Sequence, residues 1–576
     1  MENKQCQNCK KDFTIESEDF NFYKKMKVPA PTFCPDCRMI RRMSFLNERT
    51  FYKRNCDLTG ELIVSLFPEN SEVPVYSPKA WWSDEWDAMD YGVDYDFSVP
   101  FFEQFKKLLR KVPQFSLQNQ YTTMINTEYV NMGTYLKNCY FVFNTAHSED
   151  SFFTTFFLNG KNCIDIYKGD KCELCYESQI VYRCYKVLYS YDCIDCTDVF
   201  FSKRLSGCQN CFGCVNLRNK SYHIFNKAYS RESYLKEIKK FNLGSHSFIE
   251  LMKKQTEEFQ SKFPVKYREG NRNHDVYGDQ IYQSRNVHNS FEIYGVEDSK
   301  HCQFIFHKPA HDCYDMTFWG DNASRIYECM GAGNNEDLIK FSFDCWAPAI
   351  NIEYSYHIVS PNKNLFGCIG LKNKEYCILN KQYKKEEYFS MVEKIKKHMD
   401  DMPYIDSKGI MYKYGEFFPT EISLFAYNET FAQSYFPLTK EEALSQGFVW
   451  KDREENKYDV TIKAENLPDD IKDIDESILD QVIECRVSKR AFRITPAEFQ
   501  FYKSMNIPLP RLHPDERHKE KLKKQNPLKL WQRKCMCDKS NHFHGGNKCE
   551  VEFKTSYSPD RPEIIYCEKC YQQEIY

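Results

Sequence analysis

The 576-residue sequence has no long apolar run, and its start, "MENKQCQNCKKDF", has no apolar core. A membrane-spanning helix needs about 20 apolar residues, and a secretory signal needs an apolar core of about 7 to 15. The sequence therefore predicts a cytoplasmic protein with no membrane segment.

Its net charge of −3 gives no overall field that would attract nucleic acid or a membrane surface. Glycine is scarce, at 21 residues. The short run "MGAG" (330–333) is no nucleotide-binding loop, because Glu336 stands where a third glycine would be needed.

Cysteine, in contrast, is abundant, at 27 residues. Disulfide-rich scaffolds are usually small secreted domains, whereas this chain is long and has no export signal. We therefore interpret the cysteines as reduced thiols. Some would bind metal, and most would be buried as small apolar side chains.

The N-terminal cysteines form two CxxC pairs, which is the spacing of a zinc ribbon. Cys6 and Cys9 are followed after a spacer by Cys34 and Cys37. Each CxxC turn directs two thiolates at one point, and two such turns complete a tetrahedron around zinc. Because all four positions are filled by protein, we predict a zinc ion that stabilises the fold rather than one that catalyses a reaction.

The C-terminal region offers more ligands than one zinc ion needs. We predict a second zinc on Cys567 and Cys570 together with two of Cys535, Cys537 and Cys549. His542 and His544 are expected to lie in a surface loop. The sequence thus predicts two zinc ions per chain.

The two ends of the chain are similar to each other. "VPAPTFCPDCR" (28–38) matches "IPLPRLHPDER" (507–517) at an offset of 479, with His513 and Glu516 in place of the second cysteine pair. Together with Cys485 these residues could bind a catalytic zinc with one open position. We favour the other interpretation, that this copy keeps its packing and has lost its metal.

The middle of the chain contains a second similarity, between 211–234 and 365–388, at an offset of 154. Short alternating strands, cysteines about nine residues apart and Asn-, Asp- and Ser-containing turns are typical of a β-solenoid. We predict a mostly β fold with short helices, in which two tandem β-solenoid-like repeats are flanked by treble-clef or zinc-ribbon modules. The predicted segments are 1–100 (zinc ribbon, basic arm and degenerate second ribbon), 101–284 (first solenoid), 285–402 (second solenoid), 403–480 (connector) and 481–576 (degenerate ribbon and C-terminal ribbon).

Some cysteines of the first repeat also have ribbon-like spacing, namely Cys172, Cys175, Cys193 and Cys196. They could bind one or two further zinc ions. The second repeat keeps the pattern with only isolated cysteines, so we favour a ladder of buried thiols. Those isolated cysteines are Cys302, Cys313, Cys329 and Cys345.

Two basic stretches flank the metal motifs. Residues 38–54 carry six basic side chains and one acidic side chain, and residues 511–534 carry nine basic and three acidic ones. A zinc ribbon beside a basic, aromatic arm is a frequent format for binding nucleic acid. The alternative is a solvated helix face. The nucleic-acid candidates of the first stretch are Arg38, Arg41, Arg42, Arg49, Lys53 and Arg54.

The motifs "CQNCKKDF", "EDFNFY" and "CPDCRMIRR" resemble a zinc-ribbon family of uncharacterised proteins from giant DNA viruses and uncultured small-genome bacteria. The resemblance implies a four-cysteine zinc ribbon and no particular activity. Some relatives carry the label of CaiB/BaiF-type CoA-transferases. The sequence has neither a glycine-rich nucleotide loop nor an acyl-transfer constellation to support that label.

We therefore predict a non-enzymatic, zinc-binding scaffold with protein partners. A zinc-ribbon protein that binds RNA or DNA is the alternative, and a metal-dependent enzyme comes third. The oligomeric state and the identity of the partner stay open.

Overall fold

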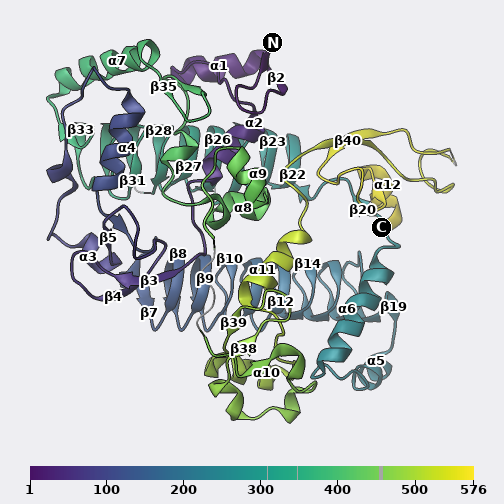
Figure 1. The fold of residues 1–576 in the computed structure, drawn as a ribbon. Coiled ribbons are helices and arrows are strands. Elements are labelled where there is room, and N and C mark those ends of the chain that lie inside the picture. The colour runs from purple at the N-terminus through teal and green to yellow at the C-terminus, as the bar shows by residue number, and fades with distance from the viewer. Residues whose placement is uncertain (308, 347, 453–457, 546, 576) are drawn as a thin grey trace.

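The computed structural model describes residues 1–307, 309–346, 348–452, 458–545 and 547–575 (Figure 1). It is mostly β with short helices, as predicted. The strands form two β-solenoids, which lie one above the other in Figure 1. The first is a 13-stranded sheet from β7 (Met124–Ile125) to β19 (Lys227–Ala228), and the second is a 14-stranded sheet from β21 (Gly270–Asn271) to β34 (Lys381–Gln382).

Each turn of the first solenoid has 12 residues, the separation between Ser178 and Ser190, which a hydrogen bond joins. In parallel strands, Val130 likewise pairs with Val142, and Val187 pairs with Val199. The backbone is left-handed at nearly every third residue from 126 to 225, so each turn has four short sides of three residues. The nine-residue spacing of cysteines noted in the sequence therefore spans three of the four sides rather than a full turn. The strands between the two ends are β8 (Glu128–Lys137), β9 (Tyr140–Glu149), β10 (Thr155–Leu158), β11 (Ile164–Asp170), β12 (Tyr176–Tyr182), β13 (Tyr185–Leu188), β14 (Tyr191–Ile194), β15 (Thr197–Phe200), β16 (Lys203–Ser206), β17 (Gln209–Phe212) and β18 (Ser221–Ile224).

The narrow interior of this solenoid explains the abundance of cysteine. One residue in three points inward, and most of these side chains are small; the larger Phe157 fits where Gly160 and Gly169 lie against its ring. The Cys172 thiol donates to the carbonyls of Asp170 and Val181, two residues before it and nine after it. The Ser178 hydroxyl donates to the carbonyls at the same two offsets. Cysteine and serine thus do the same structural work, filling the core while satisfying their own polar atom.

The second solenoid has a less regular turn. Val276 pairs with Val287, whereas Ala310 pairs with Ala323, so the length of the turn changes along the chain. One interior column is formed by Ile326, Ile339, Ile352 and Leu365, which are fully buried. The strands between its ends are β22 (His274–Tyr282), β23 (Arg285–Tyr294), β24 (Val296–Lys300), β25 (Gln303–His307), β26 (Ala310–Gly320), β27 (Ala323–Gly333), β28 (Asp337–Lys340), β29 (Phe343–Cys345), β30 (Ala349–Glu353), β31 (Tyr356–Ile358), β32 (Asn362–Phe366) and β33 (Glu375–Ile378).

The end modules cover the solenoids crosswise. The N-terminal helices α1 (Ser17–Met26) and α2 (Pro35–Met43) lie on the second solenoid, where Phe22 stacks on Tyr314 with ring centroids 3.8 Å apart (Figure 1). The C-terminal helices α10 (Pro496–Met505) and α11 (Pro514–Lys523) lie on the first, where the ring centroids of Tyr502 and Tyr176 are 5.7 Å apart. Each solenoid therefore depends on a segment from the far end of the chain for part of its core.

Equivalent ion pairs anchor the two crosswise contacts. Arg38 of α2 pairs with Asp315 of the second solenoid, and Arg517 of α11 pairs with Asp165 of the first. Arg38 and Arg517 occupy matching positions of the sequence similarity between the two ends. The duplication stays a prediction from sequence, and the structure adds that two of its matched residues make the same kind of contact.

Helices close the ends of the solenoids. Helix α7 (Lys385–Asp401), at the end of the second copy of the internal similarity, buries Tyr388, Val392 and Ile395. Its counterpart α5 (Arg231–Ile238) is capped by Ser230, whose hydroxyl accepts from the Ser233 amide. No helix in the described parts of the chain is both long and apolar enough to cross a membrane. The remaining helices of more than one turn are α3 (Pro78–Trp82), α4 (Phe101–Lys111), α6 (His246–Gln260), α8 (Phe431–Tyr435), α9 (Lys440–Ser445) and α12 (Glu568–Ile575).

Candidate metal centres

The N-terminal cysteines meet between a hairpin and a helix. Strands β1 (Glu2–Gln5) and β2 (Asp12–Ile15) pair antiparallel, and the turn that joins them carries Cys6 and Cys9. Cys34 is the N-cap of α2 and Cys37 lies in its first turn. Both thiols therefore lie at the positive end of the helix dipole.

The four sulfur atoms have the spacing of a tetrahedral site. All of them lie within 4.8 Å of one another, and the Cys9 and Cys34 sulfurs are 3.7 Å apart. A tetrahedron with Zn–S bonds of about 2.3 Å has edges of about 3.8 Å. The Cys34 amide donates to the Cys6 sulfur at 3.2 Å, and hydrogen bonds from Cys34 and Cys37 lower the pKa of Cys6 far below its usual range. The residues fit a structural zinc ion with no open position.

A second four-cysteine cluster lies at the C-terminus. It consists of Cys535, Cys549, Cys567 and Cys570, whose sulfurs also lie within 4.8 Å of one another. Cys535 and Cys549 lie in the connection between β40 (Trp531–Lys534) and β41 (Glu552–Thr555), which pair as a hairpin, and Cys567 and Cys570 lie at the start of α12 after β42 (Ile565–Tyr566). The Cys567 amide donates to the Cys535 sulfur at 3.2 Å, as in the N-terminal cluster. Of the alternatives left open, the structure selects Cys535 and Cys549.

Cys537, the remaining candidate, lies in a third group with His542, His544 and Cys570. Both histidines lie in a loop, as predicted, but His542 is buried rather than at the surface. His542 is 5% exposed, and its Nδ1 atom lies 3.1 Å from the Cys537 sulfur. The Nε2 atom of His544 lies 3.4 Å from the same sulfur. The potential ligands beyond the four cysteines of the C-terminal cluster, Cys537, His542 and His544, therefore lie together beside Cys570.

Two further frames keep the fold of a ribbon without its metal ligands. In one, the Ser77 amide donates to the Cys56 sulfur at 3.3 Å, but Ala80 takes the place of a ligand and Trp81 is buried beside it. In the other, the His513 amide donates to the Cys485 sulfur at 3.2 Å. Among the described residues, no group with metal-binding spacing includes either cysteine.

The second of these frames is held by packing and ion pairs. Phe499 and Tyr502 are buried around Cys485. Burial lowers the pKa of His513 to about 3, and its Nδ1 atom accepts from the Asp515 amide as the cap of α11. The imidazole is therefore already engaged, which fits the interpretation that this copy keeps its packing without metal.

The predicted nucleic-acid residues of 38–54 are mostly inside the protein. Arg38, Arg41 and Arg42 are at most 2% exposed and pair with acidic side chains of the second solenoid and the connector. Arg54 is also buried, bound to Asp57 and to the Pro68 carbonyl. Arg49 is half-buried, lying over Phe143 and pairing with Asp515. Of the six, only Lys53 presents its side chain to solvent, so this stretch is a structural element rather than a free basic arm.

The solenoid cysteines stay separate from the metal-type clusters. None of them belongs to a group with metal-binding spacing among the described residues. Burial raises the pKa of Cys139 to about 11, so this thiol is protonated at neutral pH. A protonated thiol that donates to backbone carbonyls is a core residue, and this arrangement matches the predicted ladder.

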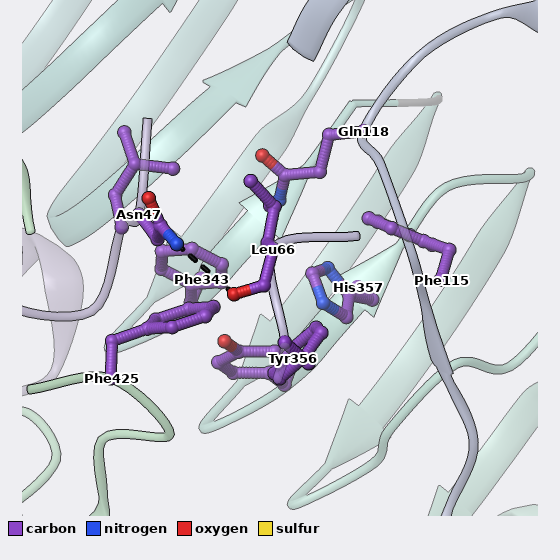
Figure 2. A pocket seen from close by; sticks show the side chains of 10 residues that line it. Asn47, Leu66, Phe115, Gln118, Phe343, Tyr356, His357 and Phe425 are labelled. Atoms are coloured by element: carbon purple, nitrogen blue, oxygen red, sulfur yellow. Dashed lines mark hydrogen bonds between the residues drawn. The ribbon is translucent and has the colours of Figure 1, made fainter. Parts of the chain in front are cut away.

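A cavity between the N-terminal segment and the second solenoid illustrates how tightly the interior packs. It measures about 10 Å³ and lies among Asn47, Leu66, Tyr356, His357 and Phe425 (Figure 2). That volume holds about one water molecule. It is far below the several hundred Å³ of a small-molecule site. In Figure 2 the Asn47 amide already donates to the Leu66 carbonyl, at 3.1 Å. This cavity is a packing defect and not a substrate pocket.

Comparisons with protein-family models, curated proteins and solved structures each find no match to this chain. The functional argument therefore depends on the cysteine clusters and on the surfaces of the solenoids.

Proposed function

We propose that this protein is a non-enzymatic scaffold in which zinc-bound end modules hold two β-solenoids together and one solenoid face binds protein partners. The observation that carries the proposal is the contrast between the faces of the first solenoid. The residue at each corner of the coil recurs once per turn, so equivalent corner residues form a column along the solenoid. One such column is covered by other parts of the chain, and another is exposed to solvent.

The covered column faces the rest of the chain. Phe153 and Asp165, two members of it, are 8% and 1% exposed, and the next member is Glu177, which pairs with Lys253 of α6. Asp165 pairs with Arg517 of α11, so α6 and α11 together cover this column and leave no space for a partner.

The open column and its neighbour form a surface that we call the ladder face. Side chains at equivalent positions of successive turns interact along this face. Tyr135 stacks on His147 with ring centroids 4.7 Å apart, Lys137 pairs with Glu149, and Arg183 pairs with Asp195. These ion-paired side chains are between 33% and 54% exposed. Strands in such a stack are about 4.8 Å apart. The result is a regular, polar and rigid surface, which suits docking of a protein more than chemistry. The ladder face comprises residues 135, 137, 147, 149, 159, 161, 171, 173, 183, 185 and 195.

The metal centres support the structural part of this proposal. Four protein thiolates complete the coordination of each four-cysteine cluster, so no position is left for substrate or for an activated water. Catalytic zinc sites keep such a position open.

The test is capture of partners by the full-length protein and by a variant with a reversed ladder face. Lys161→Glu combined with Arg183→Glu should lose bound partners while keeping the zinc content of the parent. Lys394→Glu combined with Lys397→Glu on the exposed side of α7 is the matched control and should keep them. Equal capture by both variants would refute the role of the ladder face.

Nucleic-acid binding is the second candidate, and one observation favours it. Lys11, Lys529 and Lys554 line a cavity of about 370 Å³ where the N-terminal module meets the hairpin of β40 and β41. Mixed oligonucleotides at low salt should bind there, with loss of affinity in Lys529→Ala/Lys554→Ala, if the anionic backbone is the ligand. No change in fluorescence anisotropy at low salt would dismiss this candidate.

A further inference from the structure

The C-terminal module has seven potential metal ligands in two groups that share one residue. Cys535, Cys549, Cys567 and Cys570 form the first group, and Cys537, His542, His544 and Cys570 form the second. In each group the ligand atoms all lie within 4.8 Å of one another. Cys570 is fully buried, with its sulfur in reach of both sets.

The distances in the second group match those of a metal site. A tetrahedral zinc with Zn–S of about 2.3 Å and Zn–N of about 2.05 Å places sulfur and nitrogen about 3.6 Å apart. The Cys537 sulfur lies 3.1 Å from Nδ1 of His542 and 3.4 Å from Nε2 of His544. The two imidazoles therefore present one nitrogen each to the same thiol.

The surroundings hold His542 in this orientation. Its other ring nitrogen, Nε2, lies 3.5 Å from a carboxylate oxygen of Glu574 in α12. Metal-bound histidines usually donate their second nitrogen to a carboxylate, which fixes the tautomer and the ring plane. The amide of Phe543 also donates to the Gln573 side chain at 2.9 Å. The loop that carries both histidines is thus attached to the same helix as Cys570.

We propose that this module binds two zinc ions, bridged by the Cys570 thiolate. One ion is coordinated by Cys535, Cys549, Cys567 and Cys570. The other is coordinated by Cys537, His542, His544 and Cys570. Both coordination shells are closed, so the second ion has a structural role, holding the segment that carries Cys537, His542 and His544 against α12.

The bridge is consistent with the charge at the site. Two Zn²⁺ ions carry +4, and the five thiolates carry −5, which leaves a net charge of −1. Without the second ion, no positive charge would lie between the buried Cys537 thiol and the two imidazoles that face it. The inference rests on the proposed zinc site at Cys535, Cys549, Cys567 and Cys570. It changes the expected zinc content from two ions per chain to three, counting the N-terminal site.

The experiment is a zinc count by elemental analysis and by native mass spectrometry on the full-length protein after dialysis against a weak chelator. The parent should hold three ions. His542→Ala combined with His544→Ala should hold two, and His274→Ala, at an exposed histidine remote from the cluster in sequence, should hold three. His542→Cys, which supplies a thiolate in place of the imidazole, should restore three when His544 is intact.

Bridging has its own readout. Cys570→Ser should lose both ions of the module and leave one, whereas the double histidine variant loses one. Native mass spectrometry of the parent needs no variant, so a folding failure in a variant leaves the primary count available.

The outcomes separate this inference from the proposed function. A parent with two ions, unchanged in the double histidine variant, would overturn the binuclear site while leaving the two four-cysteine sites intact. A parent with three ions that keeps all three without the histidines would also overturn it, because the third ion would then lie elsewhere. A parent with fewer than two ions would overturn both the binuclear site and the zinc-bound scaffold.

Discussion

Replacing Asp315 by asparagine should destabilise the contact between the N-terminal module and the second solenoid by about 3 to 5 kcal/mol, the usual cost of removing one partner from a buried ion pair. Asp315 is 0% exposed. One carboxylate oxygen accepts from Nε and Nη2 of Arg38 at 3.0 and 2.8 Å, and the other accepts from Nη1 of Arg42 at 3.2 Å. The variant leaves two buried guanidinium groups without their main counter-charge.

Coulomb's law gives the same scale. Two opposite charges about 4 Å apart attract by about 4 kcal/mol at an effective dielectric constant of about 20. Glu328 lies within 3.8 Å of both arginines and retains part of the compensation. We therefore expect the lower part of the range rather than the sum of two full pairs.

The matched control is Asp195→Asn on the ladder face. Asp195 pairs with Arg183 at 2.6 Å, but both side chains are more than half exposed. Exposed pairs contribute about 0 to 1 kcal/mol. The same chemical change at the same kind of pair should therefore have a small effect there.

The measurement is hydrogen exchange of α2 and β26 by mass spectrometry, because a chain of several packed units is not expected to unfold in two states. Amides of α2 should exchange faster in the Asp315 variant, by a factor of about 100 or more if about 3 kcal/mol is lost from the local opening equilibrium. Equal protection in the Asp315 and Asp195 variants would show that the buried cluster does not anchor the module.

The pH dependence has a definite sign. Burial, the largest single effect, raises the pKa of Asp315, but the charges of Arg38 and Arg42 together outweigh it, so this pKa is depressed in the folded state. A depressed carboxyl pKa contributes stability above the unfolded value of about 3.9, and this contribution is lost as the pH falls through the folded value. Protection of α2 should therefore fall in acid in the parent and change less in the asparagine variant.

Three further predictions concern other parts of the molecule. Cys9→Ser should lower the zinc content by one ion and increase the protease sensitivity of the segment from β1 to α2. Cys172→Ser should keep the full zinc content, because serine makes the same carbonyl contacts in the solenoid, and equal zinc loss in both variants would contradict the interpretation of the solenoid cysteines as buried thiols. Glu336→Gln should stabilise the protein increasingly as the pH rises above about 4.3, since burial raises the pKa of this carboxyl well above its ordinary value and the folded state retains a proton that the unfolded state releases. Denaturant midpoints at pH 6 and pH 9 measure the effect, and a constant difference would contradict it. Asp165→Asn should weaken protection of α11 as Asp315→Asn weakens that of α2, and hydrogen exchange of α11 measures it.

The features that the sequence predicted well are local ones. The N-terminal four-cysteine cluster depends on two turns and one helix start, each specified by a few neighbouring residues, so spacing alone was enough to identify it. The class of the middle region was also accessible, because short strands with small buried residues recur along it. The length of its turn was not, because the cysteines recur both nine residues apart, as Cys175 and Cys184 do, and twelve residues apart, as Cys172 and Cys184 do, and neither spacing alone marks a full turn.

The features that the sequence could not give depend on distant partners. Arg38, Arg41 and Arg42 have the composition of a surface arm, and their acidic partners in the second solenoid lie far away in the chain. His542 has the composition of a polar loop, and the residue that orients it, Glu574, lies at the other end of the module. The signal that was present was the surplus of ligands between 535 and 570, which a single zinc ion could not use.

The crosswise packing gives the zinc sites a role in assembly. Arg38 of α2 can reach Asp315 only after the second solenoid exists, since the two are separated by 277 residues. Contacts of such long range form slowly, because the chain must close a large loop before any contact compensates for the lost entropy. A module with few buried apolar residues would not stay folded during that delay unless something local stabilised it. Zinc bound at the proposed site would supply that local stability, because its free energy would add directly to the folding of the hairpin and helix that carry the four cysteines. On this proposal, zinc matters most before the solenoids meet their end modules, and the buried arginine contacts matter most afterwards.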